Sequence, residues 1–265
     1  MGNFIRSFAI RHSPFAIRPM AVSVILLAAG YATRLYPLTK DCPKALLPLG
    51  HGVILDEVVR SLDGVPGLRR RFLVVNRRFV GQFRSWQRAS GADIEILDDG
   101  TQTPETRLGA IRDVELARRS ADPRDDLLVI GTDNLFRWSL ADFVTAARRY
   151  HPSPSIALWD APSREAARPF GVVTRDPNRR ITAFVEKSPA PPSTEVALCV
   201  YYFPAPMGGD IQRFIAEGGN ADAPGYFIEW LVRRGVVYGV MMPGAWYDIG
   251  TPEAYQAVVN EWTSS

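Results

Sequence analysis

The chain has 265 residues, which is enough for one large α/β domain or two small ones. Apolar residues make up 46% and charged residues 22%, a balance that excludes a disordered or fibrous protein. Two cysteines and three histidines provide neither a disulfide framework nor the ligand spacing of a zinc site. No apolar run approaches the roughly 20 residues of a membrane-spanning helix, so we expect no membrane partner.

The net charge of +3 comes entirely from the first 20 residues, which carry three arginines and no acid. Of the 31 basic residues, the 28 that remain in 21–265 equal the 28 acidic residues, so we expect no nucleic-acid partner. Residues 1–20 are interpreted as a leader outside the fold, either an upstream extension of a chain starting at Met20 or a transit peptide. The rest is expected to be cytoplasmic, and its sequence does not decide between a monomer and a homo-oligomer.

From residue 21 onward, apolar runs of strand length alternate with segments of helical spacing. The first strands are expected at 23–28, 71–76, 94–98 and 127–132. The first helices are expected at 52–62, 79–89, 106–119 and 139–150. Strands that alternate with helices predict a largely parallel sheet that is covered on both faces.

After about residue 155 several strands follow one another. They are expected at 155–160, 171–175, 181–186 and 196–203. Helices near 208–217 and 225–234, a strand over 236–242 and a final helix at 252–262 complete the chain. We therefore expect one α/β domain over 21–262, with a Rossmann-like, mostly parallel mixed sheet and helices on both faces. We interpret the first half of this domain, 21–150, as nucleotide-binding. We interpret its second half, 151–262, as an α+β extension that completes a site.

The segment LLAAGYATRLYPLTKDCPKALLPLG at 26–50 predicts a loop suited to an anion. A strand ends just before Gly30, and this glycine with the small Ala32 lets backbone N–H groups approach a ligand closely. Arg34 can form paired hydrogen bonds to phosphate oxygens, and Lys44 lies in a continuation stiffened by prolines. Because open α/β sheets bind ligands at the carboxyl ends of their strands, we expect a phosphate-rich ligand here.

Lysine is rare in this chain, which makes its positions informative. Only Lys40, Lys44 and Lys187 are lysines among the 31 basic residues. Where arginine serves almost everywhere, a lysine is expected where a compact ammonium group is needed. We expect this of Lys44 and Lys187, and we interpret Lys40 as solvated.

These motifs resemble those of the sugar-1-phosphate nucleotidyltransferases. LAAGYATRLYPLT and PKALLPLG are followed, in the order of the family, by GTDNLF at 131–136, FGVV at 170–173, FVEKS at 184–188 and WYDIGTPEAY at 246–255. The resemblance extends from about Val22 to Tyr255. It implies Mg²⁺-dependent transfer of a nucleotidyl group from an NTP to a sugar 1-phosphate, with release of pyrophosphate. A pyrimidine NTP such as dTTP, UTP or CTP is favoured.

The implied chemistry needs cations more than it needs a general base. A phosphate monoester has a second pKa near ~6, so the attacking oxygen is already ionised at neutral pH. What remains is to neutralise and align two anions that repel each other. The resemblance implies that Arg34 binds the triphosphate, that Lys44 binds the α-phosphate region and that Lys187 binds the incoming sugar phosphate.

The resemblance also assigns binding residues. Mg²⁺ would be held by Asp133, after a predicted strand, and by Asp248 in WYDIGT; both offer the oxygen ligands that this ion prefers. The nucleotide would lie on Leu27, Ala28, Ala29, Gly30, Thr33, Arg34, Gln102, Gly109 and Asp133, with Gln102 or Thr103 as readers of the base. The acceptor would lie on Gly171, Glu186, Lys187 and Cys199, with the Glu186 carboxylate accepting hydrogen bonds from sugar hydroxyls.

Three positions depart from the pattern of the family. Ala32 replaces a glycine, so we expect a negative φ there and a slightly shifted loop. Ser188 replaces a proline, which loosens the backbone after Lys187. Cys199 replaces a glycine beside the sugar, which indicates either an altered or smaller acceptor pocket or a small buried hydrophobic residue.

Two other functions are open from the sequence. The same fold could transfer a cytidylyl group to a phosphonate or a phosphorylated amino alcohol. A catalytically silent, ligand-sensing paralogue is the other, and it is disfavoured by the joint presence of Arg34, Lys44, Asp133, Lys187 and Asp248. A glycosyltransferase would usually carry an Asp-x-Asp metal motif and would not explain PKALLP.

Overall fold

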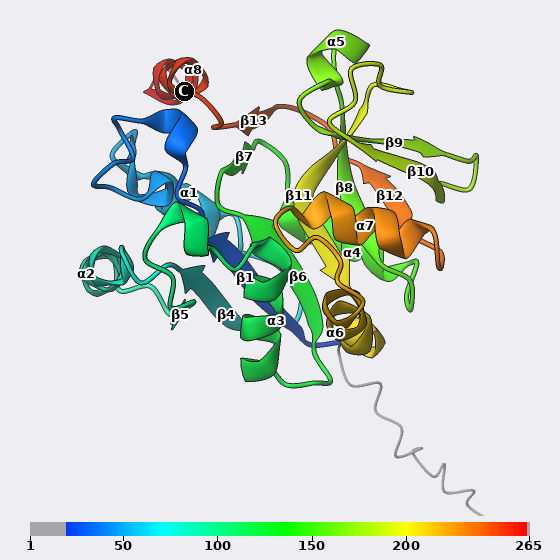
Figure 1. Ribbon diagram of the computed structural model, residues 1–265, viewed down its shortest axis with the longest axis horizontal. Coiled ribbons are helices and arrows are strands. Elements are labelled where there is room, and N and C mark those ends of the chain that lie inside the picture. Colours follow the sequence, from blue (N-terminus) through cyan, green and yellow to red (C-terminus); the bar gives the residue numbers. More distant parts are fainter. Residues whose placement is uncertain (1–19, 264–265) are drawn as a thin grey trace, which may run out of the picture.

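The computed structural model describes residues 20–263 (Figure 1). The leader expected at 1–20 lies, apart from Met20, outside the described residues. Within them, a mixed sheet of nine strands forms the centre, in the order β10-β9-β11-β6-β1-β4-β5, and β8 and β12 join it through β11. Its strands are β1 (Val22–Ala28), β4 (Leu68–Val75), β5 (Glu95–Asp98), β6 (Asp126–Gly131), β8 (Ser155–Asp160), β9 (Gly171–Arg175), β10 (Ile181–Glu186), β11 (Glu195–Phe203) and β12 (Tyr238–Met241).

The first half of the sheet is parallel. β1 pairs in parallel with β4 on one side and with β6 on the other, and β4 pairs in parallel with β5. Side chains of β1 alternate between two hydrophobic cores, with Val24 and Leu26 on one face and Ile25 on the other. The chain moves outward from β1 to β5 and then returns to β6, so the direction of winding reverses between β1 and β6. Open α/β sheets bind ligands at such a switch point.

The second half of the sheet is mainly antiparallel and is built around β11. This strand pairs antiparallel with β6, β8 and β9, and β9 continues into an antiparallel pair with β10. β12 lies parallel to β8 at the edge. The change from alternating strands and helices to consecutive strands thus marks the change from parallel to antiparallel pairing.

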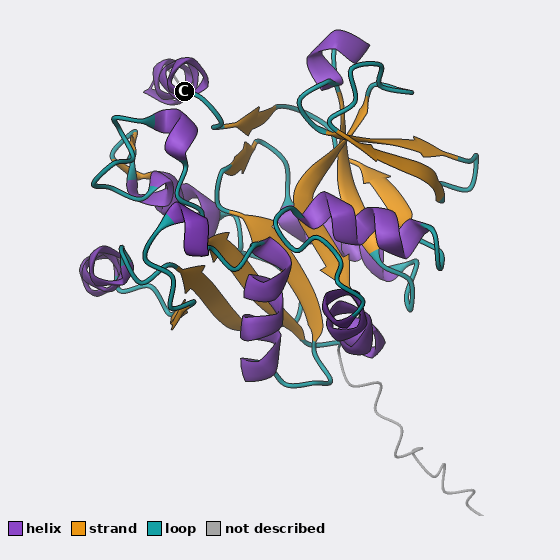
Figure 2. Cartoon of the chain, in the orientation of Figure 1, coloured by secondary structure: helices purple, strands orange, loops and turns teal. Residues whose placement is uncertain are grey.

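Helices cover both faces of the sheet (Figure 2). The helices are α1 (Ile54–Arg60), α2 (Val80–Ser90), α3 (Ala110–Ser120), α4 (Leu140–Arg148), α5 (Arg164–Ala167), α6 (Gly208–Ala216), α7 (Pro224–Val232) and α8 (Pro252–Thr263). Buried side chains of α1, α2 and α4 belong to one core, and those of α3, α6 and α7 to the other. The predicted fold class is therefore confirmed. No helix of the described chain is long and apolar enough to cross a membrane.

Two short ribbons were not expected from the sequence. β2 (Pro48–Leu49) pairs with β3 (Gly52–Val53), and β7 (Asn134–Phe136) pairs with β13 (Trp246–Asp248). Strands of two or three residues carry too few positions to show a period. The β7–β13 ribbon sets Asp248 opposite Asn134 and thereby decides the geometry of the site described below.

The helix expected over 106–119 begins only at Ala110. Gly109 has a φ of +89°, which cannot continue a right-handed helix, and Pro104–Thr106 form a separate 3₁₀ turn. A Cβ at Gly109 would lie 2.5 Å from the carbonyl oxygen of Ala221. The start of α3 is therefore set by a close contact with a distant segment.

Candidate active site

A cavity of about 330 Å³ opens at the carboxyl ends of β1 and β6, where the winding of the sheet reverses. Most residues that the sequence assigned to the nucleotide line it: Leu27, Ala28, Ala29, Gly30, Arg34, Gly109 and Asp133. Lys44 and Cys199 line it as well. Thr33 and Gln102 are exposed and are not among its lining residues. The strand that precedes Gly30 ends at Ala28, so the loop begins where the apolar run stops.

The expectation of a negative φ at Ala32 is wrong. Ala32 adopts the left-handed conformation, with φ +47° and ψ 43°. Its carbonyl oxygen accepts hydrogen bonds from the Leu35 N–H at 2.9 Å and from the buried Thr39 hydroxyl at 2.8 Å. These contacts hold a non-glycine residue in a conformation that costs about 1 kcal/mol. The loop thus keeps the backbone path of a glycine at this position.

Lys44 connects three segments of the chain where they meet at the cavity. Its ammonium group donates to Asp133 Oδ2 at 3.0 Å and to the carbonyl oxygen of Ile249 at 2.6 Å. Only 16% of the side chain is exposed. An ammonium group has three donors, so one is left for a ligand in the cavity. This arrangement brings together the motif PKALLP, the end of β6 and the residue after β13.

Asp133 and Asp248 lie side by side through the β7–β13 ribbon. Asp248 is opposite Asn134, and the Ile249 N–H donates to the Asp133 carbonyl at 3.2 Å. Burial, followed by the charge of Asp133, raises the pKa of Asp248 to about 6. Burial also opposes ionisation of Asp133, but the charge and hydrogen bond of Lys44 outweigh it and hold the pKa of Asp133 below its ordinary value.

These two carboxylates fit Mg²⁺ by the chemistry of their donors. Both are oxygen ligands, and their negative charges face each other in a partly desolvated place. Residues 20–263 contain no group of three or more His, Cys, Asp or Glu side chains that could hold a metal ion. A pair of carboxylates is nevertheless sufficient for Mg²⁺, which keeps several waters and uses substrate phosphates as ligands.

Arg34 and Lys187 lie near the aspartate pair. A Cβ placed on Gly250 would lie 2.8 Å from Asp248 Oδ2 and 3.9 Å from Arg34 Nη2, so this guanidinium group is close to the carboxylate. The charges of both Arg34 and Lys187 lower the pKa of Asp248. Lys187 has a φ of +49° and a largely exposed side chain, with its ammonium nitrogen 3.8 Å from Glu186 Oε1. Lys44 and Arg34 therefore lie at the carboxylates, whereas Lys187 lies beside Glu186 and outside the residues that line the cavity.

Glu186 lies close to two glycines in the half of the domain that is expected to bind the acceptor. It pairs with Gly171 across β9 and β10, and a Cβ on Gly171 would lie 3.0 Å from Glu186 Oε2. A Cβ on Gly225 would lie only 2.1 Å from the same oxygen. Burial raises the pKa of Glu186, and the charge of Lys187 opposes this. The two glycines leave room for a half-buried carboxylate that can accept hydrogen bonds.

Cys199 is a neutral wall of the cavity. Burial, followed by the charge of Asp133, raises the pKa of its thiol to about 12. A Cβ on Gly131 would lie 2.9 Å from Cys199 Sγ, so the sulfur packs against the end of β6. An uncharged thiol fills space here and has no nucleophilic role.

Four charged residues of the cavity were missed by the sequence analysis: Asp99, Arg107, Asp113 and Asp222. Arg107 forms an ion pair with Asp222, Nε to Oδ1 at 2.5 Å. Asp113 is 6% exposed, and burial, followed by the charge of Asp99, raises its pKa to about 8. A signal was present: this acid lies between the buried residues Ile111 and Val114 of α3, where an apolar side chain is expected.

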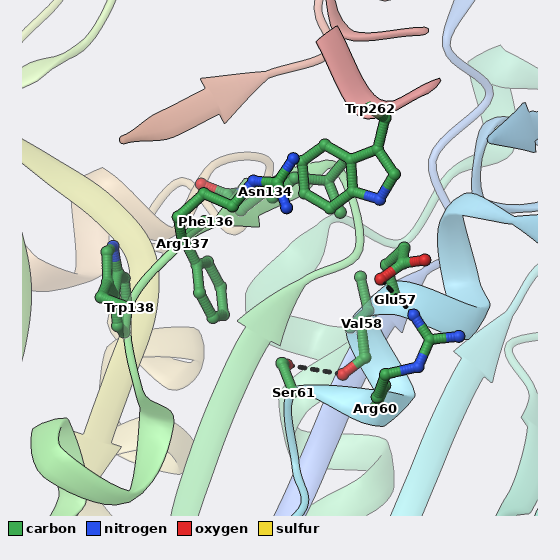
Figure 3. A pocket seen from close by; sticks show the side chains of 10 residues that line it. Glu57, Val58, Arg60, Ser61, Asn134, Phe136, Arg137, Trp138 and Trp262 are labelled. Carbon is green, nitrogen blue, oxygen red and sulfur yellow. Dashed lines mark hydrogen bonds and ion pairs between the residues drawn. The ribbon is translucent and has the colours of Figure 1, made fainter. Parts of the chain in front are cut away.

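A second cavity of about 220 Å³ lies between α1, β7 and α8 (Figure 3). The Arg137 guanidinium carbon lies 3.9 Å from the centre of the Trp262 ring, and Arg60 is paired with Glu57. Phe136 and Trp138 stack with ring centres 4.0 Å apart. The two arginines are thus engaged by neighbouring side chains.

The chain is similar to several known proteins. The bifunctional protein GlmU of Methanocaldococcus jannaschii is 26% identical over 235 residues, which are 87% of this chain and 52% of GlmU. The chain therefore spans about half the length of this relative. A structure described as a glucose-1-phosphate thymidylyltransferase from Bacillus anthracis, in complex with sucrose, has a TM-score of 0.77 at 22% identity and covers 92% of this chain and 96% of its own. UDP-glucose pyrophosphorylase complexed with UDP-glucose has a TM-score of 0.76 at 17% identity, over 92% and 99% of the two chains.

These two structures share the fold at low sequence identity. The family described as nucleotidyl transferase matches residues 23–265, which include both halves of the sheet and every element that carries a residue of the cavity. The family predicted from the motifs is confirmed: the chain belongs to the nucleotidyl transferase family.

Proposed function

We propose that the protein transfers a nucleotidyl group from a pyrimidine NTP to a sugar 1-phosphate and releases pyrophosphate. The observation that carries this proposal is the placement of Lys44 and Arg34 beside the Asp133–Asp248 pair at the cavity, with the charge of Lys187 also acting on Asp248. Such a site neutralises two phosphorylated reactants. The names of the similar proteins, a thymidylyltransferase and a pyrophosphorylase of sugar phosphates, agree with it.

The reaction follows from charge and alignment. An oxygen of the sugar phosphate attacks the α-phosphorus of the NTP in line, a P–O bond forms, and the bond to the β-phosphate oxygen breaks. Lys44 would bind the α-phosphate with its third donor, and Arg34 would bind the triphosphate. Because the acceptor phosphate is already ionised, no side chain needs to remove a proton.

Asp133 and Asp248 would hold Mg²⁺, which supplies charge neutralisation to the phosphates. Lys44 and the Asn134 amide each occupy one oxygen of Asp133, the amide at 2.8 Å, and so orient its carboxylate. Asn134 is held in turn by the Trp246 indole N–H at 2.8 Å. The ribbon therefore positions the carboxylates before a ligand binds.

We assign the nucleotide to the half of the domain over 21–150 and the acceptor to the half over 151–262. In the second half, Lys187 would bind the sugar phosphate and Glu186 would accept hydrogen bonds from its hydroxyls. The position of the Glu186 carboxylate supports this: its side chain is 15% exposed and lies 3.8 Å from the Lys187 ammonium nitrogen, so its oxygens can accept hydrogen bonds from a ligand. The Cys199 side chain in the cavity wall would limit the size of the acceptor. The need for an NTP and a sugar 1-phosphate would place the reaction in the cytoplasm.

The test is a pyrophosphate-release screen of five NTPs against a panel of sugar 1-phosphates and small phosphonates at millimolar Mg²⁺. We expect release with a pyrimidine NTP and a sugar 1-phosphate. Lys44→Met should lower the release rate about 100- to 1,000-fold, and Lys40→Met, at an exposed lysine of the same loop, is the matched control. Absence of release with every pair at micromolar enzyme would overturn the proposal. Release with phosphonates alone would show that the acceptor is wrong.

A further inference from the structure

Charged residues of both signs line the cavity, and among them Arg107 and Asp222 pair with each other. Arg34 and Lys44 lie at the side of the aspartate pair, where the phosphates are proposed to bind. Asp99, which follows β5, and Asp113, in the first turn of α3, line the same cavity. A triphosphate would not be placed against two acids. If the phosphates bind at the cationic side, the nucleobase lies at the acidic one.

Asp113 has a buried carboxyl oxygen that is unpaired within the described part of the chain. Its side chain belongs to a residue that is 6% exposed, and its Oδ1 atom is buried with no hydrogen-bond partner in residues 20–263. Buried polar atoms are almost always paired, and one that is unpaired in the wall of a ligand cavity indicates a contact made by the ligand. The Asp113 N–H already donates to the Gly109 carbonyl at 3.1 Å, and the Asp113 side chain lines the cavity.

The Asp99 carboxylate, in contrast, accepts hydrogen bonds from its neighbours. Thr101 donates to it from its N–H at 2.7 Å and from its hydroxyl at 2.8 Å, and the Tyr31 hydroxyl donates to the Thr101 hydroxyl at 3.0 Å. Hydrogen bonds of this kind favour the ionised carboxylate. Burial raises the pKa of Asp99, but these hydrogen bonds oppose it. The pKa of Asp113 is raised to about 8, so its carboxyl carries a proton at neutral pH, while the hydrogen bonds from Thr101 make Asp99 an acceptor.

This pair of carboxyls matches one kind of base edge. Neutral Asp113 offers one donor and one acceptor, and ionised Asp99 offers acceptors only. The complementary edge has a ring nitrogen that accepts and an amino group that donates twice, as N3 and N4 of cytosine do. Uracil and thymine carry a carbonyl oxygen at position 4, which would face the Asp99 carboxylate with no proton between them.

We propose that Asp113, together with Asp99, reads the amino edge of the nucleobase and makes CTP the preferred pyrimidine donor; this inference rests on the proposed function. Gly109 supports it by keeping the start of α3 close to the cavity. Gln102 and Thr103, the alternative readers expected from the sequence, are exposed and lie outside the lining of the cavity. The two acids therefore take the role that was expected of that loop.

The experiment compares equilibrium binding of CTP, UTP, dTTP, GTP and ATP without acceptor, and then kcat/KM for the same nucleotides with one sugar 1-phosphate. We expect a preference for CTP over UTP of about 100-fold, expressed mainly in the dissociation constant and KM. ATP presents the same amino edge on a larger ring and is expected to bind more weakly than CTP.

Three variants separate recognition from folding. Asp113→Asn keeps one donor and one acceptor and should retain the preference for CTP. Asp113→Leu should weaken the binding of CTP at least tenfold and leave the binding of UTP nearly unchanged. Asp99→Asn adds a donor that can face a carbonyl oxygen, so it should lower the CTP-to-UTP ratio at least tenfold. Glu105→Gln, an exposed acid of the loop before α3, is the matched control and should keep the ratio.

The outcomes distinguish this inference from the proposed function. A preference of the wild-type protein for UTP, dTTP, GTP or ATP over CTP overturns the inference, even when pyrophosphate is released. An unchanged ratio in both Asp99→Asn and Asp113→Leu overturns it as well. Failure of every nucleotide to bind or react overturns the proposed function itself.

Discussion

The Lys44 ammonium group lies 3.0 Å from Asp133 Oδ2, although 89 positions separate the two residues along the chain. The same group donates to the carbonyl oxygen of Ile249, 205 positions away. One largely buried cation therefore holds the loop after β1, the end of β6 and the residue after β13 in a common geometry. Its charge also opposes the effect of burial and lowers the pKa of both carboxylates that we propose as metal ligands.

Replacement of Lys44 by methionine should reduce both activity and stability. Turnover is expected to fall about 100- to 1,000-fold, because a preorganised charge next to the reacting phosphate is lost. The free energy of unfolding should fall by about 1 to 3 kcal/mol, because Asp133 and the Ile249 carbonyl lose a donor. Pyrophosphate release and thermal unfolding measure the two effects. Lys44→Arg should recover more stability than turnover, and a full recovery of turnover would show that a compact ammonium group is not needed.

Removal of divalent metal should abolish the reaction. EDTA is expected to stop pyrophosphate release, and added Mg²⁺ to restore it. Asp248→Asn should raise the Mg²⁺ concentration needed for half-maximal rate at least tenfold, because an amide replaces an anionic ligand. Asp93→Asn replaces a fully exposed acid and should leave that concentration unchanged. A rate that does not depend on metal would contradict the assignment of Asp133 and Asp248.

Asp113 should make stability depend on pH. The folded protein keeps its proton up to about pH 8, whereas the unfolded chain releases it near ~4, so the folded state binds more protons in between. Stability is therefore expected to fall as pH rises from about 4 to about 8 and then to stay level. Asp113→Asn does not titrate, so its stability relative to the wild type should grow over that window by on the order of 2 to 5 kcal/mol.

Denaturant unfolding at several pH values measures this difference. Asp93→Asn, which changes an exposed acid, should give a nearly constant difference over the same range. A difference between Asp113→Asn and the wild type that does not change with pH would show that the Asp113 carboxyl is ionised in the folded protein.

Gly225→Ala should weaken binding of the acceptor and leave binding of the nucleotide unchanged. Its Cβ would lie 2.1 Å from Glu186 Oε2, so the carboxylate must move. We expect KM for the sugar 1-phosphate to rise at least tenfold and KM for the NTP to stay within twofold. Gly209→Ala is a close control, because Gly209 is also the second residue of its helix and its Cβ would meet no atom within 4 Å. Equal effects of the two variants would exclude a role of Glu186 in acceptor binding.

Ala32→Gly should stabilise the protein. A glycine adopts φ +47° without the clash that an alanine has there, which favours the folded state by about 0.5 to 1 kcal/mol after the entropy of glycine is counted. Thermal unfolding should show a rise of roughly 2 °C. Ala141→Gly, in the right-handed backbone of α4, should change stability in the opposite direction. A loss of stability in Ala32→Gly would mean that the alanine methyl group contributes packing that outweighs the strain.

Much of this protein could be predicted from local sequence. The strands over 155–160, 171–175 and 181–186 have the bounds that were expected, because apolar runs and alternation report burial on one or both faces. The loop motifs with Gly30, Arg34 and Lys44 also lie where their position after β1 indicated. Such features depend on residues that are neighbours in the chain, so a single sequence contains the information.

Three features depended on contacts between distant segments. The β7–β13 ribbon places Asp248 opposite Asn134, yet each strand has only three residues and no period of its own. The sign of φ at Ala32 depends on the partners of its carbonyl group, and the neutral carboxyl of Asp113 depends on the face of α3 that packs inward beside Asp99. Residue types and their spacing thus determined the fold class and the cationic half of the site. Burial and long-range pairing, which are properties of the folded chain, decided how the acids are placed and charged.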